Sequence, residues 1–461
     1  MRPVPLAAAL ALSAAMAPIT GLAQPAGETE QSLLRDVAAQ VEPGRLHATI
    51  ERLVAFGTRH TLSDTTSPTR GIGAARSWVK GQFEDLAKAC GGCLIIATPS
   101  QVFTGERVPK PTQIMDVLAI QRGTGDPDRV VVISGHLDSR VTDAMNATSD
   151  APGANDDASG VAAVMEAARI LSKQKFSATI VYAVLSGEEQ GLYGGKVLAD
   201  YATANGWRVE ADLNNDIIGN IHGMDGRTDD THVRVFSEGT KAVESSEQAN
   251  RRRYNGGEVD SPSRNVARLL DGLADKYLTG LDVEMIYRTD RFSRGGDQVR
   301  MLEAGFPAVR ITEADENYTR QHQDVRTENG VAYGDVLAGV DFPYLAQVTR
   351  LNILGLAAMA AAPAPPEGVK TEGAVTADTR VSWTAVPGAA GYRVWWRSTT
   401  DPQWRFSRDA GPAASLTLTG VNIDDWFFGV QSVGADGFAG PVVFPGAAGD
   451  FVSAKPSSAK P

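Results

Sequence analysis

The sequence predicts an α/β domain with a mostly parallel central sheet flanked by helices, followed by a small all-β sandwich domain. Between residues 130 and 218, short apolar runs typical of strands alternate with helical stretches, a pattern that indicates βαβ units. After residue 366 the pattern changes to short strands separated by Gly, Pro and Asp turns. A Pro-rich stretch at residues 358–366 separates the two patterns and is typical of a linker.

The composition of the 461-residue chain excludes several classes of protein. Hydrophobic residues make up 43% and charged residues 21%, which indicates buried cores and excludes a disordered or fibrous chain. The net charge of −11 argues against nucleic acid as a partner, because binding to phosphates needs an excess of Lys and Arg. We therefore expect a globular protein with no nucleic-acid partner.

The first residues have the pattern of an export signal. Arg2 gives a positive start, residues 6–16 form an apolar stretch, and the small residues at 21–23 suit a cleavage site. We expect residues 1–23 to be a signal peptide and the protein to be exported, either periplasmic or extracellular; a buried N-terminal helix is the alternative. The longest later apolar run, at 353–362, is too short to cross about 30 Å of hydrocarbon, so no membrane span is expected.

The remaining chain divides into three parts. A domain at residues 24–361 carries the chemistry, and a sandwich domain follows at 362–446. The tail at 447–461 is rich in Ala, Gly, Ser, Lys and Pro and is expected to be disordered.

The chain has two cysteines, Cys90 and Cys93, which are separated by two glycines. In an oxidising compartment, a local disulfide is the expected state of this pair, and a redox motif is the alternative. A zinc site would need a second pair of ligands, which the chain lacks among its cysteines.

The α/β region reads as an ordered series of elements, each with its own apolar run. Strands are expected where the apolar run is short, and helices where a polar loop leads into a longer apolar stretch. In chain order we expect a strand at residues 130–134, a helix at 160–171, a strand at 179–186, a helix at 191–202 and a strand at 209–218.

Acidic residues and one histidine follow the ends of these strands. His136 comes directly after the first apolar run, and Asp156 lies in the polar loop that leads into the first helix. Glu188 and Glu189 follow the second strand, and Asp216 lies at the end of the third. Because ligands bind at the carboxyl ends of parallel strands, we expect these side chains to meet in one crevice.

So many carboxylates are stable together only if a cation neutralises them, because like charges at short range raise pKa values and cost stability. Zinc accepts His nitrogen and carboxylate oxygen, and two zinc ions need a carboxylate that bridges them. One acid should stay off the metal to act as a general base toward water, and the adjacent Glu188 and Glu189 offer one residue for each role.

Here the sequence resembles zinc metallopeptidase family 28, the secreted aminopeptidases with two zinc ions. The resemblance runs from about residue 46 to 361, through GHLDS at 135–139, GANDDASG at 153–160, GEEQGL at 187–192, DIIG at 216–219, and His322. It implies a zinc aminopeptidase fold, two Zn²⁺ per chain, and peptide substrates with a free N-terminus. The implied roles are ligation of one zinc by His136 and Asp216, ligation of the other by Glu189 and His322, bridging by Asp156, general-base catalysis by Glu188, and orientation of His136 by Asp138.

The sequence departs from the family pattern at two places. Gln321 precedes His322, where many members have a tyrosine, so Tyr318 is only a candidate for that tyrosine's role. Asp297 lies in Gly-Asp-Gln at 296–298, where many members have Ser-Asp-His. A role for Asp297 in lining the site is left open.

The C-terminal region resembles a fibronectin type III domain over about 80 residues. The resemblance rests on Trp383, GYRV at 391–394, LTGV at 418–421, and the Asp-Gly pair at 436–437. It implies a ligand of its own, such as a polymer or a surface.

Other functions remain open at this point. The same scaffold could serve a carboxypeptidase, a deacylase, or a glutaminyl cyclase-like enzyme with one zinc ion, although the two ligand sets argue against the last. A binding protein, in which the α/β domain has lost its activity, is a third class; the retained Glu188 argues against it.

Overall fold

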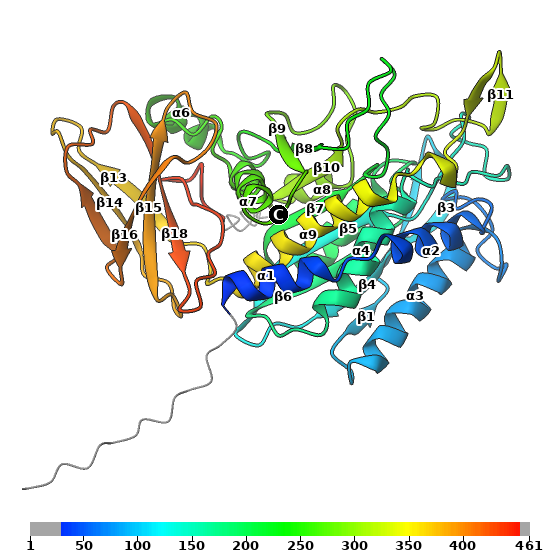
Figure 1. Cartoon of the computed structure of the whole chain (residues 1–461), viewed down its shortest axis with the longest axis horizontal. Helices are drawn as coiled ribbons and strands as arrows, with labels where there is room; N and C mark the ends of the chain where they lie inside the picture. The colour runs from blue at the N-terminus through cyan, green and yellow to red at the C-terminus, as the bar shows by residue number, and fades with distance from the viewer. Residues whose placement is uncertain (1–28, 452–461) are drawn as a thin grey trace, which may run out of the picture.

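The computed structural model describes residues 29–451 (Figure 1), so the predicted signal peptide at 1–23 lies outside the described residues. Of the predicted tail, residues 452–461 also lie outside them. The described part extends to Phe451, whose side chain is buried against the core, so ordered packing continues beyond the boundary expected at 446. Within the described part, no helix is long and apolar enough to cross a membrane.

An eight-stranded sheet forms the centre of the α/β domain, with the strand order β1-β4-β6-β5-β7-β10-β8-β9. Its inner strands β6, β5, β7 and β10 are parallel neighbours, whereas β1 and β4 pair antiparallel at one edge. The predicted mostly parallel α/β fold is thus confirmed. The strands are β1 Ile95–Ala97, β4 Val117–Gln121, β5 Asp126–His136, β6 Ala178–Leu185, β7 Arg208–Asn215, β8 His232–Phe236, β9 Asp282–Ile286 and β10 Ala308–Glu313.

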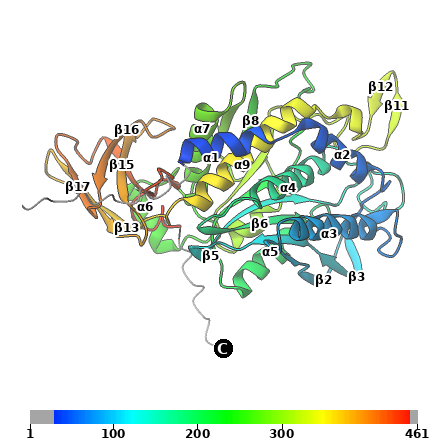
Figure 2. The ribbon, with the colours of Figure 1, turned by 60° about the horizontal axis from the view of Figure 1, so that its bottom comes forward.

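Helices cover both faces of this sheet (Figure 2). In β5, Val131 and Ile133 pack into one hydrophobic cluster and Val130 and Val132 into another, because alternate side chains of a strand point to opposite faces. Both faces are therefore dry, which explains why the strand is a continuous apolar run. The first face is covered by α1 Glu30–Ala39, α2 Pro43–Val54, α4 Ala158–Leu171, α7 Pro262–Tyr277 and α9 Phe342–Ala361, and the second by α5 Tyr193–Ala204 and α8 Gln298–Glu303.

Smaller elements surround the sheet. α3 Gly71–Ala89 packs beside β1 and β4, and α6 Ser246–Asn255 precedes α7. A separate hairpin pairs β2 Ser100–Gly105 with β3 Val108–Met115. A second short hairpin, β11 Arg326–Glu328 with β12 Val331–Tyr333, and a 3-10 turn at Leu337–Gly339 lie between β10 and α9.

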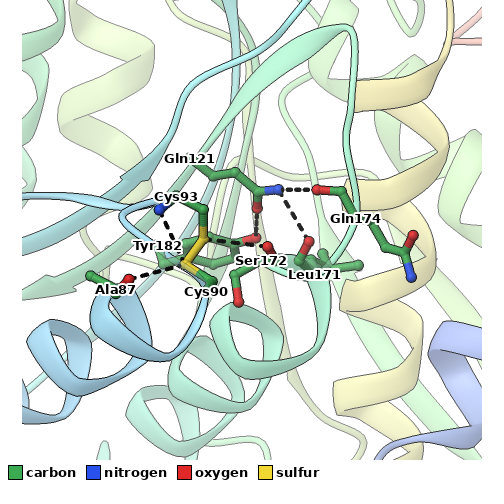
Figure 3. The surroundings of a disulfide bond; sticks show 8 residues. All are labelled: Ala87, Cys90, Cys93, Gln121, Leu171, Ser172, Gln174 and Tyr182. Atoms are coloured by element: carbon green, nitrogen blue, oxygen red, sulfur yellow. Dashed lines mark hydrogen bonds between the residues drawn. A yellow bond between two sulfur atoms is a disulfide. The ribbon is translucent and has the colours of Figure 1, made fainter.

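The predicted disulfide between Cys90 and Cys93 is present at the end of α3 (Figure 3). Gly91 and Gly92 both have positive φ angles, 72° and 88°, which side-chain-bearing residues rarely adopt, and this lets the chain turn back within two residues. A buried polar network lies beside it, in which the Tyr182 hydroxyl donates to Gln121 over 2.7 Å.

The C-terminal region forms two antiparallel three-stranded sheets that face each other. Their shared core contains Val369, Val381, Val394 and Leu418, all fully buried. The first sheet is β13 Glu367–Glu372, β14 Thr379–Thr384 and β17 Ser415–Leu418, and the second is β16 Phe406–Gly411, β15 Gly391–Ser398 and β18 Trp426–Val433.

The sandwich-like sheets lie toward the amino ends of the central strands. Arg129, near the start of β5, donates to the carbonyl oxygen of Ala362 over 2.9 Å, at the point where the chain leaves α9. His136 is the last residue of β5, so it lies at the end of the strand opposite to Arg129 and this junction.

Candidate metal centre

The predicted strand-end residues meet at one edge of the sheet. His136 is the last residue of β5, and Asp216 directly follows β7. Glu188 and Glu189 lie in the loop after β6, and Asp156 lies two residues before α4. The expectation that the carboxyl ends of these strands gather the acids beside one histidine is confirmed.

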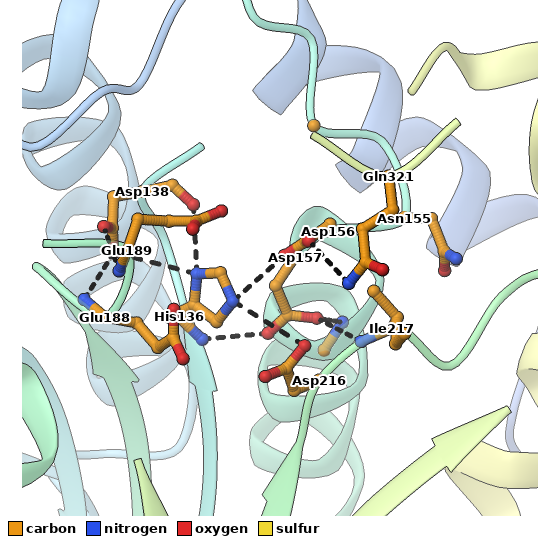
Figure 4. Close-up of polar contacts among 12 residues, drawn as sticks. His136, Asp138, Asn155, Asp156, Asp157, Glu188, Glu189, Asp216, Ile217 and Gln321 are labelled. Atoms are coloured by element: carbon orange, nitrogen blue, oxygen red, sulfur yellow. Dashed lines mark hydrogen bonds and ion pairs between the residues drawn. The ribbon is translucent and has the colours of Figure 1, made fainter. Parts of the chain in front are cut away.

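Two overlapping groups of potential ligands form at this edge, and Figure 4 shows the residues of the first group together with Glu189 of the second. The first comprises His136, Asp156 and Asp216, and the second Asp156, Glu189 and His322; within each group the ligand atoms lie within 4.8 Å of one another. His136 Nε2 lies 3.2 Å from Asp156 Oδ1, and His322 Nε2 lies 3.0 Å from Asp156 Oδ2. The two oxygens of Asp156 thus face one group each.

This donor set fits a pair of zinc ions. Each group contains one imidazole, one carboxylate of its own and the shared carboxylate of Asp156, and zinc takes nitrogen and oxygen ligands of these kinds. Burial lowers the pKa of the His136 imidazole, but the carboxylates of the surrounding aspartates raise it well above its usual value. The carboxylates therefore favour a positive charge at the position that His136 Nε2 faces.

Asp138 holds both the histidine and the neighbouring loop. Its backbone carbonyl accepts a hydrogen bond from His136 Nδ1 over 3.0 Å, which places the ring proton on Nδ1 and leaves Nε2 free to bind a cation. Its carboxylate lies 3.7 Å from Nδ1 and instead accepts the backbone N–H groups of Gly187 and Glu189 and the Thr61 hydroxyl. Asp138 thus contacts His136 mainly through its main chain.

The loop that carries Asp156 is fixed by two further aspartates that sequence reasoning missed. The Asp335 carboxylate accepts the backbone N–H groups of Asn155 and Asp156, the latter over 2.7 Å. Asp157 caps α4 and accepts the backbone N–H of His136 over 2.9 Å. The peptide bond between Asp156 and Asp157 is cis. The hydrogen bonds of Asp335 and Asp157 hold the loop that carries the Asp156 carboxylate beside the end of β5.

Two arginines that the sequence did not single out contact the candidate ligands. Arg310 of β10 is fully buried and lies 2.6 Å from Asp216 Oδ2. Arg140 lies 3.1 Å from Glu189 Oε2 and 2.8 Å from His322 Nδ1. A guanidinium can only donate, so binding of a metal at His322 Nε2, which leaves the ring proton on Nδ1, requires Arg140 to move away.

Glu188 faces the cavity without a partner. Among the described residues its carboxylate has no hydrogen-bond or ion-pair partner, and burial raises its pKa well above its usual value. The cavity has a volume of about 370 Å³, which is enough for a small substrate group. It is lined by Arg107, Arg140, Asp156, Glu188, Glu189, Gly191, Leu192, Asp216, Arg291, Arg294, Gly295, Gln321 and His322.

Three residues are connected with the departures from the family pattern: Gln321, Tyr318 and Asp297. They differ in whether they line the cavity. Gln321 lines the cavity, and its Nε2 donates to Asp156 Oδ2 over 3.3 Å. Tyr318 does not line it; its ring is half-exposed and lies 5.9 Å from the Arg294 guanidinium. Asp297 is buried, does not line the cavity, and accepts a backbone N–H of α5. Of these three residues, only Gln321 both lines the cavity and contacts a candidate ligand.

Comparison with known proteins agrees with this geometry. The model of peptidase family M28 matches residues 116–334, the segment that contains every candidate ligand. A probable zinc metalloprotease of Leptosphaeria maculans is 45% identical over 92% of this chain and 99% of its own length. Another, from Pyricularia oryzae, is 42% identical over 91% of this chain and 87% of its own. Both alignments are long enough to include the C-terminal sheets.

Solved structures resemble this chain in fold. LapA of Legionella pneumophila is 17% identical, with a TM-score of 0.51 over 74% of this chain and 80% of its own. A second structure of that protein, described as an aminopeptidase, has a TM-score of 0.50 over 76% and 80%, and LapB of the same organism a TM-score of 0.50 at 18% identity over 72% and 76%.

Proposed function

Since this chain belongs to peptidase family M28 and to a group of zinc metalloproteases, we propose that it is an aminopeptidase that holds two zinc ions and removes N-terminal residues from peptides. In this proposal His136 and Asp216 hold one ion, Glu189 and His322 hold the other, and Asp156 binds both. When bound, such ions polarise the scissile carbonyl and lower the pKa of water.

Glu188 is the general base of the proposed reaction. Its unpartnered carboxylate faces the cavity beside both ligand groups, and this is the observation that carries the proposal. It takes a proton from the attacking water and passes it to the nitrogen of the leaving amine. Glu189, next to it in sequence, instead faces His322 Nε2 at 3.0 Å. The two adjacent glutamates thus have separate roles.

The free amine of the substrate is proposed to bind among the acidic side chains that line the cavity. Glu188 and Asp216 are two of these, and carboxylates favour a protonated amine. The description of the Legionella LapA structure as an aminopeptidase supports the same choice. Two complete ligand groups argue against a one-zinc cyclase, and an unpartnered Glu188 argues against an inactive binding protein.

Export and a separate role for the C-terminal sheets complete the proposal. The signal-like pattern at residues 1–23 and the disulfide between Cys90 and Cys93 support export, because disulfides persist in oxidising compartments. The sheets at 367–433 carry the fibronectin type III-like pattern. None of their residues lines the cavity, so any ligand of theirs, such as a polymer or a surface, binds elsewhere.

The experiment compares leucine amide with N-acetyl-leucine amide on the zinc-loaded protein. An acetyl group removes the charge of the amine and adds bulk where the substrate should end, and a misplacement of about 1 Å can cost about 10²-fold in rate. We expect kcat/KM to fall by at least that factor. Equal values for the two compounds would reject the aminopeptidase proposal in favour of a deacylase or an endopeptidase.

A further inference from the structure

Three arginines, Arg107, Arg291 and Arg294, line the cavity and form no ion pair with a candidate ligand among the described residues; we call them its arginine side. Arg107 comes from the turn between β2 and β3, whereas Arg291 and Arg294 come from the loop between β9 and α8. These segments are far apart in sequence, yet they present guanidinium groups to the same cavity. The acidic residues of the metal centre line the same cavity.

The loop arginines belong to a cluster, with Arg234 of β8 and Arg310 of β10, that carries more positive charge than the neighbouring acids neutralise. Glu316 accepts ion pairs from Arg291, Arg294 and Arg234, at 3.3, 3.1 and 3.2 Å. The only other acid paired with these three arginines, among the described residues, is Asp290, which lies 3.2 Å from Arg291. Asp290 also lies 3.7 Å from Arg310, whose other partner is Asp216 at 2.6 Å. Four guanidinium groups thus share three carboxylates, which leaves one positive charge beside the cavity.

Arg107 adds a second unneutralised charge. It donates one hydrogen bond, over 3.0 Å, to the backbone carbonyl of Glu189. It has no carboxylate partner within the part of the chain that the structure describes, and its side chain is exposed. A guanidinium has five N–H donors, so most of those of Arg107 are available to a ligand in the cavity.

Gln321 connects the arginine side to the metal centre. Its Oε1 accepts a hydrogen bond from Arg294 over 3.3 Å, while its Nε2 donates to Asp156 over the same distance. The amide therefore spans from a cavity arginine to the carboxylate shared by both ligand groups. The Gln321 side chain alone thus separates Arg294, and any ligand group that it binds, from Asp156 of the metal centre.

We propose that this arginine side of the cavity binds a carboxylate of the substrate close to the scissile bond. Arginine binds carboxylates through paired, charge-assisted hydrogen bonds, so a neutral group of the same shape should bind much less well. The carboxylate has two sources: the side chain of an N-terminal Asp or Glu, or the C-terminus of a very short peptide. This preference rests on the proposed aminopeptidase function and names the substrates on which it acts best.

The test compares substrates that differ only in the carboxylate, on the zinc-loaded full-length protein. For the side chain, the pair is α-glutamyl and glutaminyl p-nitroanilide; for the C-terminus, it is Leu-Ala and Leu-Ala amide. Because hydrogen bonds to charged groups are among the strongest, we expect kcat/KM to be about tenfold or more higher for the carboxylate member of one pair. Ratios near one in both pairs would overturn the proposal.

Arginine variants identify the binding groups. Arg107→Gln and Arg294→Gln are expected to reduce the carboxylate-to-amide ratio of kcat/KM by about tenfold. The control is Arg208→Gln, an exposed arginine at the start of β7 that pairs with Asp126, far from this edge of the sheet. A ratio that falls equally in the control, or in none of the three, would overturn the assignment.

A binding measurement separates this proposal from the proposed function. The shift in melting temperature is recorded with L-glutamate, L-glutamine and L-glutamine amide. A larger shift with L-glutamate than with L-glutamine, or with L-glutamine than with L-glutamine amide, supports the arginine site. This holds even if no peptide is hydrolysed, and in that case only the aminopeptidase function fails. Hydrolysis of leucyl and glutaminyl substrates with no carboxylate preference in rate or binding overturns the arginine site alone.

Discussion

Arg397 of β15 donates a hydrogen bond of 2.7 Å to the Asp260 carboxylate, which also accepts one of 2.8 Å from Arg268 of α7. Arg397 and Asp260 are at most 1% exposed. The C-terminal sheets are therefore joined to the α/β domain by charges that water does not reach. Trp404 adds a hydrogen bond to Asn265 at the same junction.

A chain that ends at Ala361 is expected to lose solubility or melting temperature. The sequence alone suggests that such a chain would fold, since every proposed ligand precedes the linker. Truncation instead removes Arg397 and exposes apolar residues of α9 that share one hydrophobic cluster with Phe438 and Val443. Thermal melting and gel filtration measure the effect. A truncated protein as stable as the whole chain would contradict this.

A point substitution at the same junction tests the ion pair directly. Arg397→Met leaves Asp260 buried with one partner fewer, and breaking a buried pair typically costs about 3–5 kcal/mol. The matched control is Arg380→Met, because Arg380 pairs with Glu372 on the surface and such pairs contribute about 0–1 kcal/mol. Equal melting temperatures of the two variants would show that the buried pair adds nothing.

Glu188→Gln is expected to keep both zinc ions and to lower turnover by at least about 10²-fold, the usual contribution of a positioned acid or base. The amide has the shape of the carboxylate but cannot take the proton, and Glu189 remains in place beside His322. Metal content and rate are measured on one preparation. If the variant instead loses a zinc ion and keeps most of its rate per metal-loaded site, Glu188 is the zinc ligand and Glu189 the general base.

Asp156→Ala should remove both zinc ions together, because one carboxylate faces both ligand groups. Bound metal stabilises the folded state by mass action, so the melting temperature in the presence of zinc should fall as well. Asp150→Ala is the control, an exposed aspartate on the same segment whose one ion-pair partner within residues 29–451 is Arg70. If the variant retains one zinc ion of normal affinity, Asp156 is not shared.

The sequence located the metal centre because its residues follow an order that topology enforces. Residues after successive parallel strands must meet at one edge of the sheet, so His136, Asp216 and the glutamates could be brought together from apolar runs alone. The strand boundaries were less accurate. β5 runs from Asp126 to His136 and not only over 130–134, since its polar ends pair with neighbouring strands that the apolar pattern does not reveal.

The groups that support the ligands were beyond the reach of the sequence. Asp335 lies 179 residues after Asp156, in a loop with no apolar pattern, and its function depends on a contact that only the folded chain creates. Arg310 interrupts the apolar residues of strand β10. A charged residue within an apolar run was the one sequence feature that could have indicated a buried ion pair. The sequence could not name its partner, Asp216, because ion pairing over 94 residues leaves no local pattern.

The stability of the protein is expected to depend on pH through Glu238, a buried acid away from the metal centre. Burial raises the pKa of Glu238 from 4.5 to about 7, although the N–H of Ala242 and the charge of Lys241 oppose this. Between these values the folded chain keeps a proton that the unfolded chain releases. The folded state therefore binds more protons, and its stability falls as pH rises through this interval, by up to about 3 kcal/mol.

Glu238→Gln keeps the shape of the side chain and stays neutral, so the melting temperature of the variant should rise relative to that of the parent from pH 4.5 to 8. Measuring both proteins at a fixed zinc concentration cancels the titration of the metal ligands, which they share, and a constant difference in melting temperature across the range would exclude this role of Glu238.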